Sequence, residues 1–383
     1  MNSERIYLDN AATTPLRAEV ADAMRAAFED SGFNPSSLHA EGRRARAVLD
    51  DARDRIAASL RAPRTAIIFT GSGTEADNQA LLGVTRGSAR PAHVIASAIE
   101  HHAVMGVLDR LQSEGFETTL LPVDAEGSVH PAAFEEALRP HTVLASIMYV
   151  NNEIGTVQPI AQLARIARER GVIFHADAIQ APSWLPVGVD DLSVDMLSLS
   201  AHKLGGPKGI GVLYAREGLR LEPIVLGGGQ ESGRRSGTEN VLGAAGFAAA
   251  LELAAAERAE KSPRIAALRD RLEDGIRSLI PEVRVNGAGS ERSANISNVS
   301  FAGVDSAALL IGLDLAGIAV SAGSACTSGA LEASHVLAAL GLEERWRRGA
   351  IRFSLGASTA LPEIERTIAA LPGLVAALRA PVA

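Results

Sequence analysis

The spacing of apolar residues in the first half of the chain alternates between two periods. From about Thr65 to Tyr214, short apolar runs alternate with stretches in which apolar residues recur every three or four positions. This is the spacing of β-strands joined by helices, so it predicts an α/β unit with a mainly parallel sheet. We expect strands at 66–70, 93–97, 143–150, 172–177, 196–200 and 211–215, with helices such as 103–113 and 160–170 between them.

The second half begins with a different pattern. After the Gly-rich segment 227–240, an Ala-rich stretch keeps helical periodicity to about Leu279, which predicts one long helix bridging two domains. Strand-like and helical runs then resume from Val283. Because a single core rarely grows beyond ~250–300 residues, a chain of 383 residues is expected to form two domains. We predict a large α/β domain over 15–257 and a smaller α+β domain formed by 1–14 and 258–383.

Composition and charge narrow the functional classes. Hydrophobic residues make up 47% of the chain and charged residues 21%, a balance typical of soluble globular proteins. The net charge of −8 and the lack of a basic run argue against a nucleic-acid partner. The first residues do not resemble a secretory signal, and no apolar stretch reaches spanning length. We therefore expect a cytoplasmic protein without a membrane contact.

The chain has one cysteine, Cys326, so it cannot form an internal disulfide. Such a residue is either a small buried hydrophobic residue or a reactive thiol with a function. Its neighbours in SAGSACTSG are small and polar, which favours an accessible nucleophile over an inert core residue.

A second motif, SLSAHKLGGPKGIG, places Ser200, His202 and Lys203 at the end of a predicted strand and before a Gly-rich turn. An isolated lysine is ordinarily a solvated surface charge. Here the turn lets the backbone approach a ligand closely, and a lysine at this place can form a Schiff base with a pyridoxal cofactor. The motif alone does not decide the matter, so the other parts of such a site must be found.

A pyridoxal site needs an acid beside the nitrogen of the pyridine ring. The string HADAIQ supplies Asp177 at another predicted strand end, with Gln180 three residues further on. One alternative for Asp177 is a helix cap. Another is a metal pair with His175, but no third ligand accompanies it at a suggestive spacing, so we expect no metal.

The string GSGTEADN follows a predicted strand and opens a helix, so the amide of Gly73 and the Thr74 side chain face an anion such as a phosphate. The same string also spells G-x-G-x-x-A, and Glu100 closes the next predicted strand, as in a dinucleotide-binding fingerprint. A dinucleotide-dependent dehydrogenase is therefore an alternative. It leaves the lysine, acid and cysteine motifs without roles, whereas one pyridoxal site uses them all.

Two further polar residues follow predicted strands. His101, in EHHAV, could stack on a planar ring and relay protons, although a lone loop histidine is usually a surface residue. Asn152, in VNNEIGTVQPI, could donate to a cofactor oxygen, although a turn-forming asparagine is the common alternative. Because ligands of open α/β sheets bind at the carboxyl ends of the strands, we expect both residues near Lys203.

In this order, these strings resemble the cysteine desulfurases of nitrogen fixation and iron–sulfur-cluster assembly, within the class V aminotransferase superfamily. The resemblance extends from YLDNAATTPL and FNPSSLH near the start, through the motifs above and GRRSGTENV, to IRFSLG near the end. It implies an α/β fold type I transferase that uses pyridoxal 5'-phosphate and L-cysteine. It also implies a homodimer and a partner that accepts sulfur, such as an iron–sulfur scaffold protein.

The resemblance implies roles for individual residues as well. Lys203 would hold the cofactor, His101 would stack on its ring and Cys326 would carry a persulfide. Asn34 and Arg352 would hold the substrate carboxylate, the arginine by a two-point contact. The remaining cofactor-binding residues would be Gly73, Thr74, Asn152, Asp177, Gln180, Ser200, His202 and, from the other chain of the dimer, Thr238 of the partner subunit.

Two strings depart from the family pattern. The cofactor loop reads GSGT where many relatives have SGAT, and SAGSACTSG begins with one serine where many begin with two. Neither departure removes a side chain with an implied role. The alternatives that remain are a selenocysteine lyase or another class V enzyme, the dinucleotide-dependent dehydrogenase, and a non-catalytic scaffold.

Overall fold

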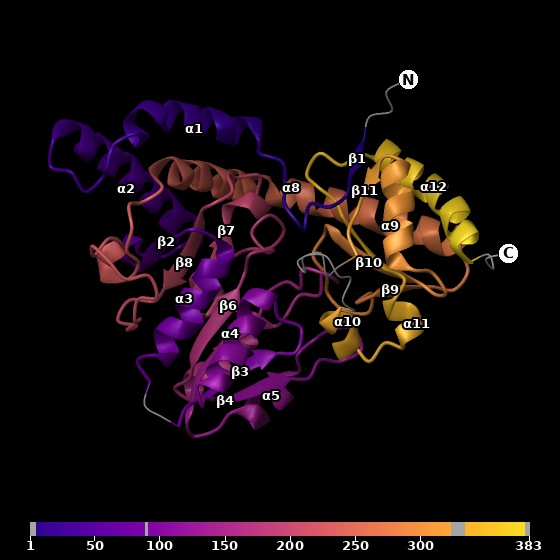
Figure 1. Ribbon diagram of the computed structural model, residues 1–383, viewed down its shortest axis with the longest axis horizontal. Helices are drawn as coiled ribbons and strands as arrows, with labels where there is room; N and C mark the ends of the chain where they lie inside the picture. The colour runs from indigo at the N-terminus through magenta and orange to yellow at the C-terminus, as the bar shows by residue number, and fades with distance from the viewer. Residues whose placement is uncertain (1–4, 89–90, 323–333, 380–383) are drawn as a thin grey trace.

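The computed structural model describes residues 5–88, 91–322 and 334–379. One part of the molecule contains a seven-stranded sheet between helices, and the other contains a smaller sheet with helices α9 (Ser306–Leu315) and α12 (Leu361–Arg379) (Figure 1). The N-terminal strand β1 (Ile6–Tyr7) belongs to the smaller part, where it pairs with β11 (Ile318–Ala319). The first and the last described residues therefore lie in the smaller part.

The large sheet has the strand order β2-β8-β7-β6-β5-β3-β4. Strands β7, β6, β5, β3 and β4 are parallel, whereas β8 is antiparallel to both of its neighbours, β2 and β7. The bounds along the sheet are β2 (Ile67–Thr70), β8 (Gly211–Ala215), β7 (Met196–Ser200), β6 (Ile173–Asp177), β5 (Thr142–Ser146), β3 (His93–Ser97) and β4 (Glu117–Leu121).

All six predicted strands are present, but two details differ. The strand expected at 143–150 ends at Ser146, because the chain beyond it turns into the loop that carries Asn152, although Tyr149 N still donates to Asp177 O. Strand β4 was not predicted. It lies at the edge of the sheet and four of its five side chains are exposed or half-buried, so it lacks an apolar run.

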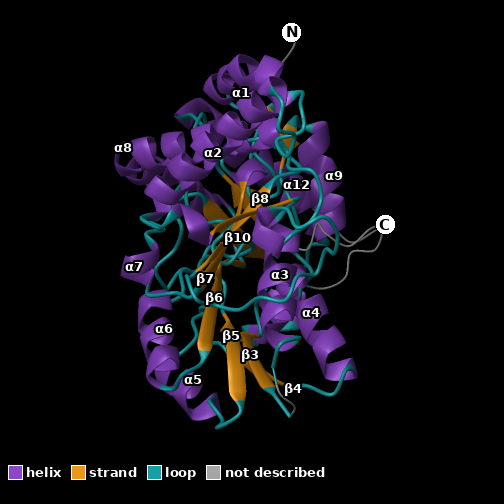
Figure 2. Cartoon of the chain, turned by 90° about the vertical axis from the view of Figure 1, so that its left-hand side faces the viewer, coloured by secondary structure: helices purple, strands orange, loops and turns teal. Residues whose placement is uncertain are grey.

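Helices cover both faces of this sheet (Figure 2). Alternate side chains of a strand point to opposite faces, and β6 shows the consequence. Phe174 and Ala176 join the apolar cluster beneath α2 (Ala40–Leu60), α6 (Ile160–Glu169) and α8 (Val241–Leu279). His175 and Asp177 therefore point to the other face, which α3 (Gly73–Thr85) and α4 (His102–Ser113) cover. The other helices of this part are α1 (Ala18–Ser31), α5 (Pro131–Ala137) and α7 (Val189–Leu192), with 3-10 turns η1 (Arg64–Ala66), η2 (Ala201–Lys203) and η3 (Glu231–Gly233).

The smaller part is built on an antiparallel sheet with the order β12-β10-β9. Its strands are β12 (Ala350–Ser354), β10 (Ile296–Phe301) and β9 (Val283–Asn286). Helices α9 and α12 pack on it and share a second apolar cluster. Two short helices, α10 (His335–Ala339) and α11 (Glu344–Arg347), complete this part.

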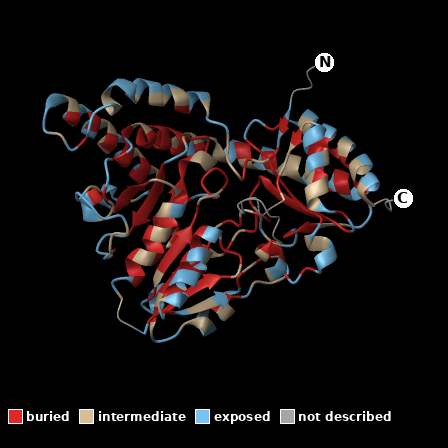
Figure 3. Cartoon of the chain, viewed as in Figure 1, coloured by how far each residue is buried: buried red, intermediate tan, exposed pale blue. Residues whose placement is uncertain are grey.

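Helix α8 is the long helix that the sequence predicts, and it ends at Leu279 as expected. The Asn240 side chain caps it by accepting a hydrogen bond from Gly243 N at 2.9 Å. Its first half buries residues in the cluster under the large sheet, and its second half buries Ile265 and Leu272 in the cluster of the smaller part. Figure 3 shows buried residues along its inner side in both parts. Among the helices that the structure describes, none combines the length and the apolar character needed to cross a membrane.

Candidate active site

A cavity of about 290 Å³ opens at the carboxyl ends of the parallel strands. The loops after β2, β3, β5, β6 and β7 contribute to its wall, together with the N-terminal segment and β12. Ten residues that the sequence nominated for the site line this one cavity: Gly73, Thr74, His101, Asn152, Asp177, Gln180, Ser200, His202, Lys203 and Arg352.

Lys203 lies in η2, directly after β7. Its Nζ donates hydrogen bonds to the carbonyl oxygens of Ala11 and Ala12, the latter at 2.8 Å. The turn that follows depends on Gly205, whose φ is +77° and where a Cβ would lie 2.5 Å from the Arg17 side chain. A side chain at this position would thus be strained and would clash. The glycine turn fixes the lysine at the cavity wall.

Asp177 is the last residue of β6 and is 5% exposed. Its Oδ1 accepts a hydrogen bond from Ile179 N at 3.0 Å. Burial raises the pKa of Asp177 to about 6, although the Ile179 amide and the charge of Lys203 act in the opposite direction. Asp177 therefore ionises close to neutral pH, where it can hold a protonated aromatic nitrogen.

An anion site lies at the N-terminus of α3. Ser72 caps the helix by accepting a hydrogen bond from Glu75 N at 3.1 Å, and Gly73 begins the helix. A Cβ at Gly73 would lie 2.3 Å from Ile179 Cδ1, so a larger residue would push the Asp177 loop away. Beside it, the buried Ser200 hydroxyl has no hydrogen-bond partner among the described residues. Helix amides and an unused hydroxyl suit a phosphate group.

Two histidines of the cavity are neutral. His101 caps α4, and its Nδ1 accepts a hydrogen bond from Ala103 N at 3.1 Å. Burial, reinforced by the charge of Lys203, lowers the pKa of His101 to about 4. The same two causes, in the same order, lower the pKa of His202 to about 4. With Nδ1 accepting, the proton of neutral His101 is on Nε2, so this ring can stack on a planar group without adding charge.

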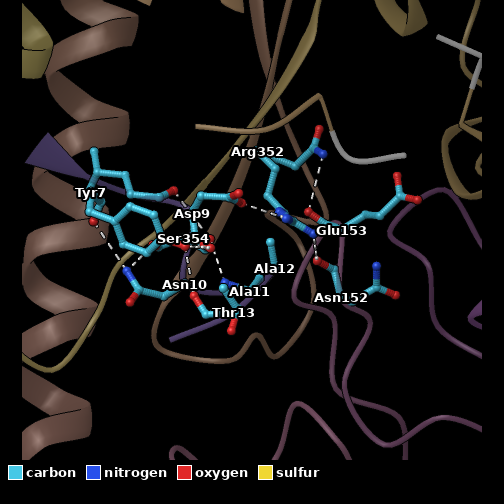
Figure 4. A network of polar contacts seen from close by, with 12 residues as sticks. Tyr7, Asp9, Asn10, Ala11, Ala12, Thr13, Asn152, Glu153, Arg352 and Ser354 are labelled. Atoms are coloured by element: carbon cyan, nitrogen blue, oxygen red, sulfur yellow. Dashed lines mark hydrogen bonds and ion pairs between the residues drawn. The ribbon is translucent and has the colours of Figure 1, made fainter. Parts of the chain in front are cut away.

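Arg352 forms the opposite wall of the cavity and comes from β12. It is 3% exposed. Its Nη1 donates to Asn152 O at 2.9 Å and its Nη2 donates to Asp9 Oδ1 at 2.8 Å (Figure 4). Its Nε has no partner within the described part of the chain. The wall of the cavity therefore includes a fixed guanidinium group, which suits a carboxylate.

Three nominated residues are not among those that line the cavity. Asn34 lies in an exposed turn, where its Oδ1 accepts a hydrogen bond from Ser36 N at 2.9 Å. Thr238 is exposed as well. Cys326 lies outside the described residues. The roles of all three therefore stay predictions.

The sequence did not identify one charged residue of the site, Asp9. Its motif, YLDNAATTPL, was recognised, but nothing near Asp9 in the sequence indicates that its carboxylate pairs with Arg352. The backbone carbonyls of Ala11 and Ala12 were missed for a related reason, since the residue type gives no sign of a main-chain contact. The spacing of residues in a single sequence does not indicate which residues far apart in the chain will be in contact.

The geometry does not support the dinucleotide alternative. Strand β2, which precedes GSGTEADN, pairs only with the antiparallel β8 and is not a neighbour of β3, so the parallel βαβ unit of that fingerprint is absent from the described sheet. Glu100 is fully buried and accepts hydrogen bonds from Ser97 Oγ and, at 2.9 Å, from Met148 N. It cannot reach a ribose from there.

His175 is also unsuited to the metal pair considered above. Its ring nitrogens are 2.8 Å from Ser146 Oγ and 2.9 Å from Ser198 Oγ. Complete burial lowers its pKa to about 3, so it is a neutral, hydrogen-bonded core residue. Over residues 5–88, 91–322 and 334–379, no three metal-binding side chains gather at one place.

Comparison with known sequences gives matches along nearly the whole chain. Residues 6–367 match the family model described as aminotransferase class-V. The chain is 46% identical over 375 residues to cysteine desulfurase IscS of Dictyoglomus turgidum, which covers 98% of this chain and 95% of that protein. It is 43% identical over 378 residues to cysteine desulfurase IscS of Methanosarcina thermophila, with 98% and 93% covered.

Solved structures give matches of the same extent. A structure titled NifS-like protein superposes with a TM-score of 0.92 at 34% identity and covers 98% of this chain and 100% of its own. A structure titled SspA in complex with cysteine superposes with a TM-score of 0.82 at 36% identity, with 93% and 100% covered. These comparisons confirm the resemblance that the motifs carried and the predicted fold class.

Proposed function

This chain belongs to the class-V aminotransferase family and, within it, to the pyridoxal-phosphate-dependent cysteine desulfurases, and we propose that its cavity takes sulfur from L-cysteine and leaves L-alanine. One observation carries the proposal. Lys203, Asp177 and the N-terminus of α3 share a single cavity with the buried Arg352. Groups that suit the cofactor and a cation that suits the carboxylate of an amino acid thus line the same cavity.

The residues of the cavity fit pyridoxal phosphate. Ser200 offers a buried hydroxyl that lacks a partner among the described residues, and Gly73 keeps the space beside it open. We propose that Asp177 holds the ring nitrogen and Lys203 holds the cofactor covalently. Asn152 and Gln180 would contact the phenolic oxygen, and the phosphate would be bound by Gly73, Thr74, Ser200, His202 and Thr238 of the partner subunit.

When bound, pyridoxal phosphate supplies an electron sink for the negative charge left at the substrate Cα after that carbon loses its proton. The residues of this chain supply the rest. Arg352 binds the substrate carboxylate and so orients the amino acid. The Lys203 amine is the base that moves the Cα proton. His101, neutral and half-buried, covers the ring without competing for that proton.

Cys326 completes the proposed reaction, on the ground of its sequence motif alone. Its thiolate attacks the substrate Sγ, so that a sulfur–sulfur bond forms while the bond between Cβ and Sγ breaks. The electron pair of the broken bond stays with the three-carbon fragment, which takes up a proton at Cβ, regains the Cα proton from Lys203 and leaves as L-alanine. Cys326 keeps the sulfur as a persulfide, which a sulfur-acceptor protein such as an iron–sulfur scaffold then collects.

We also propose that two copies of the chain form a homodimer in the cytoplasm. Asn34 and Thr238 are exposed and do not line the cavity of their own chain, as suits residues that act across a subunit boundary. Phe28, Leu38 and Leu226 expose large apolar side chains that a dimer interface would cover. The division into domains 15–257 and 1–14 with 258–383 belongs to this proposal too, and the two apolar clusters that meet along α8 support it.

The reaction is tested by following L-cysteine, L-alanine and enzyme-bound sulfur together. We expect the wild-type protein to release L-alanine and to gain the mass of one sulfur atom on the Cys326 peptide. Cys326→Ser should bind cofactor and L-cysteine but gain no sulfur. Failure of the wild type to form L-alanine would refute the proposed activity, and full activity of the serine variant would remove Cys326 from it.

A further inference from the structure

We propose that Asp9 is a positioning residue with two effects on Arg352. It fixes the orientation of the guanidinium, and it weakens the binding of that guanidinium to the carboxylate of an amino acid in the cavity. The proposal deepens the proposed function and rests on it, because there Arg352 binds the substrate carboxylate. It predicts that removing only the charge of Asp9 and removing its whole side chain have opposite effects on amino-acid affinity.

The backbone around Asp9 is held tightly against β12. Asp9 forms a parallel bridge with Ser354, and the Ser354 hydroxyl accepts a hydrogen bond from Ala11 N at 2.9 Å. The Tyr7 hydroxyl donates to Asp9 O at 3.2 Å and to Thr13 O at 2.9 Å, across the same turn. Figure 4 shows this turn with the Asp9 carboxylate pointing to Arg352. The carboxylate is therefore a fixed group.

Arg352 is equally constrained on its own side. Its backbone exchanges two hydrogen bonds with Ser321, of 2.7 and 3.2 Å. The guanidinium donates from Nη1 to Asn152 O and from Nη2 to the Asp9 carboxylate. Among the described residues, Asp9 is the one carboxylate with which Arg352 pairs. A buried arginine without a counter-charge is unfavourable by several kcal/mol. Asp9 supplies that counter-charge before any substrate arrives.

This arrangement has two consequences for a carboxylate ligand. An arginine has many rotamers, and a guanidinium fixed in advance spares the ligand the cost of ordering it. However, a second carboxylate that binds to this guanidinium approaches a pair whose net charge is zero. It is also repelled by the Asp9 carboxylate on Nη2. Asp9 should thus favour orientation and oppose affinity.

The surroundings of Arg352 leave this charge balance to Asp9. The other ionised groups that line the cavity are Lys203 and Asp177. His101 and His202 are neutral, because burial lowers the pKa of each to about 4. The product of the proposed reaction, L-alanine, carries the same carboxylate as the substrate. Weaker binding of this carboxylate by Arg352 therefore helps L-alanine to dissociate.

The test measures the dissociation constant of L-alanine for the holoenzyme from the change in cofactor absorbance. Asp9→Asn keeps an acceptor oxygen for Arg352 Nη2 and removes the charge, so L-alanine should bind roughly threefold or more tightly. Asp9→Leu has the same number and branching of side-chain heavy atoms but neither the acceptor nor the charge, so the guanidinium loses its orientation. L-alanine should then bind roughly tenfold or more weakly.

A matched control is Asp314→Asn, which breaks the pair of Arg5 with Asp314 on the exposed surface of the smaller part. It should leave the L-alanine constant unchanged, and all three variants should bind pyridoxal phosphate as the wild type does. Unchanged or weaker L-alanine binding by Asp9→Asn would overturn the proposal, as would tighter binding by Asp9→Leu. If the wild type itself responds to neither L-alanine nor L-cysteine, the proposed function fails rather than the role of Asp9.

Discussion

The two walls of the cavity fix their charged side chains by different means. On the wall built by the large sheet, Asp177 is held by the amide of Ile179, two residues away, and sits at a strand end. On the wall built by β12, Arg352 is held by Asp9, 343 residues away. Apart from Lys203, whose Nζ donates to the carbonyls of Ala11 and Ala12, the first wall is thus held by contacts local in sequence, and the second is assembled by long-range pairing.

This difference indicates a division of labour. The local wall carries the groups that suit the cofactor, whereas the assembled wall carries the cation that suits the substrate. If the division holds, variants of the first wall should change cofactor binding, and variants of the second should change amino-acid binding alone.

Asp177→Asn tests the local wall. A neutral amide cannot stabilise a protonated ring nitrogen, so turnover should fall by at least roughly a hundredfold.

Because the pKa of Asp177 is about 6, its carboxylate is present above that pH and is lost as the pH falls through it. Cofactor affinity of the wild-type apoprotein should therefore weaken from pH 7.5 to 5 more than that of the variant. Fluorescence titration with pyridoxal phosphate measures both, and parallel pH profiles would contradict the role of Asp177.

Arg352→Lys tests the assembled wall. The lysine keeps the positive charge but loses the planar two-point contact, which typically costs ~1.5–3 kcal/mol, roughly a tenfold to hundredfold weakening. We expect this loss in the dissociation constant of L-alanine, with the constant for pyridoxal phosphate unchanged. A variant that weakened cofactor binding to the same extent would show that the two walls do not work separately.

Glu100→Gln tests the buried layer below the cavity and should have the smallest effect on function. Burial raises the pKa of Glu100 to about 8, above its ordinary value of 4.5, so the folded state binds its proton more tightly. Its contribution to the free energy of unfolding is complete below pH 4.5 and is lost as the pH rises through 8. The total loss is at most ~5 kcal/mol.

The glutamine cannot ionise, so the variant should lose less stability than the wild type between pH 5 and 9. Urea denaturation of the apoprotein at several pH values measures this difference. The L-alanine constant at pH 7 should stay within roughly twofold, because the side chain at position 100 is neutral there in both proteins. A wild type and a variant with the same pH dependence of unfolding would show that Glu100 is ionised in the folded chain.

The local wall could be predicted from the sequence because each of its residues follows a strand. Asp177 ends a predicted strand, Lys203 follows another, and Gly73 opens a helix, so periodicity alone brings them to one edge of the sheet. The same periodicity failed at β4, whose half-exposed side chains at the sheet edge lack an apolar run. It also placed the end of β5 four residues too late.

The assembled wall could be predicted only in part. The resemblance nominated Arg352, but its partner Asp9 lies in the segment after β1, and their contact depends on the isolated bridge that places this segment beside Ser354 of β12. Burial was equally hidden in Glu100, which follows a predicted strand as the acid of the dinucleotide-binding alternative would. Pairing and burial are properties of the packed chain, so neither follows from the residue types and their spacing.

The site of covalent cofactor attachment tests the account most directly. Holoenzyme reduced with borohydride and then digested should carry the cofactor mass on the peptide that contains Lys203, and the yellow absorbance should disappear. Lys203→Ala should fold, lack this absorbance and show no turnover. Cofactor mass on the Lys208 or Lys261 peptide of the wild type, or covalently attached cofactor in Lys203→Ala, would contradict the account.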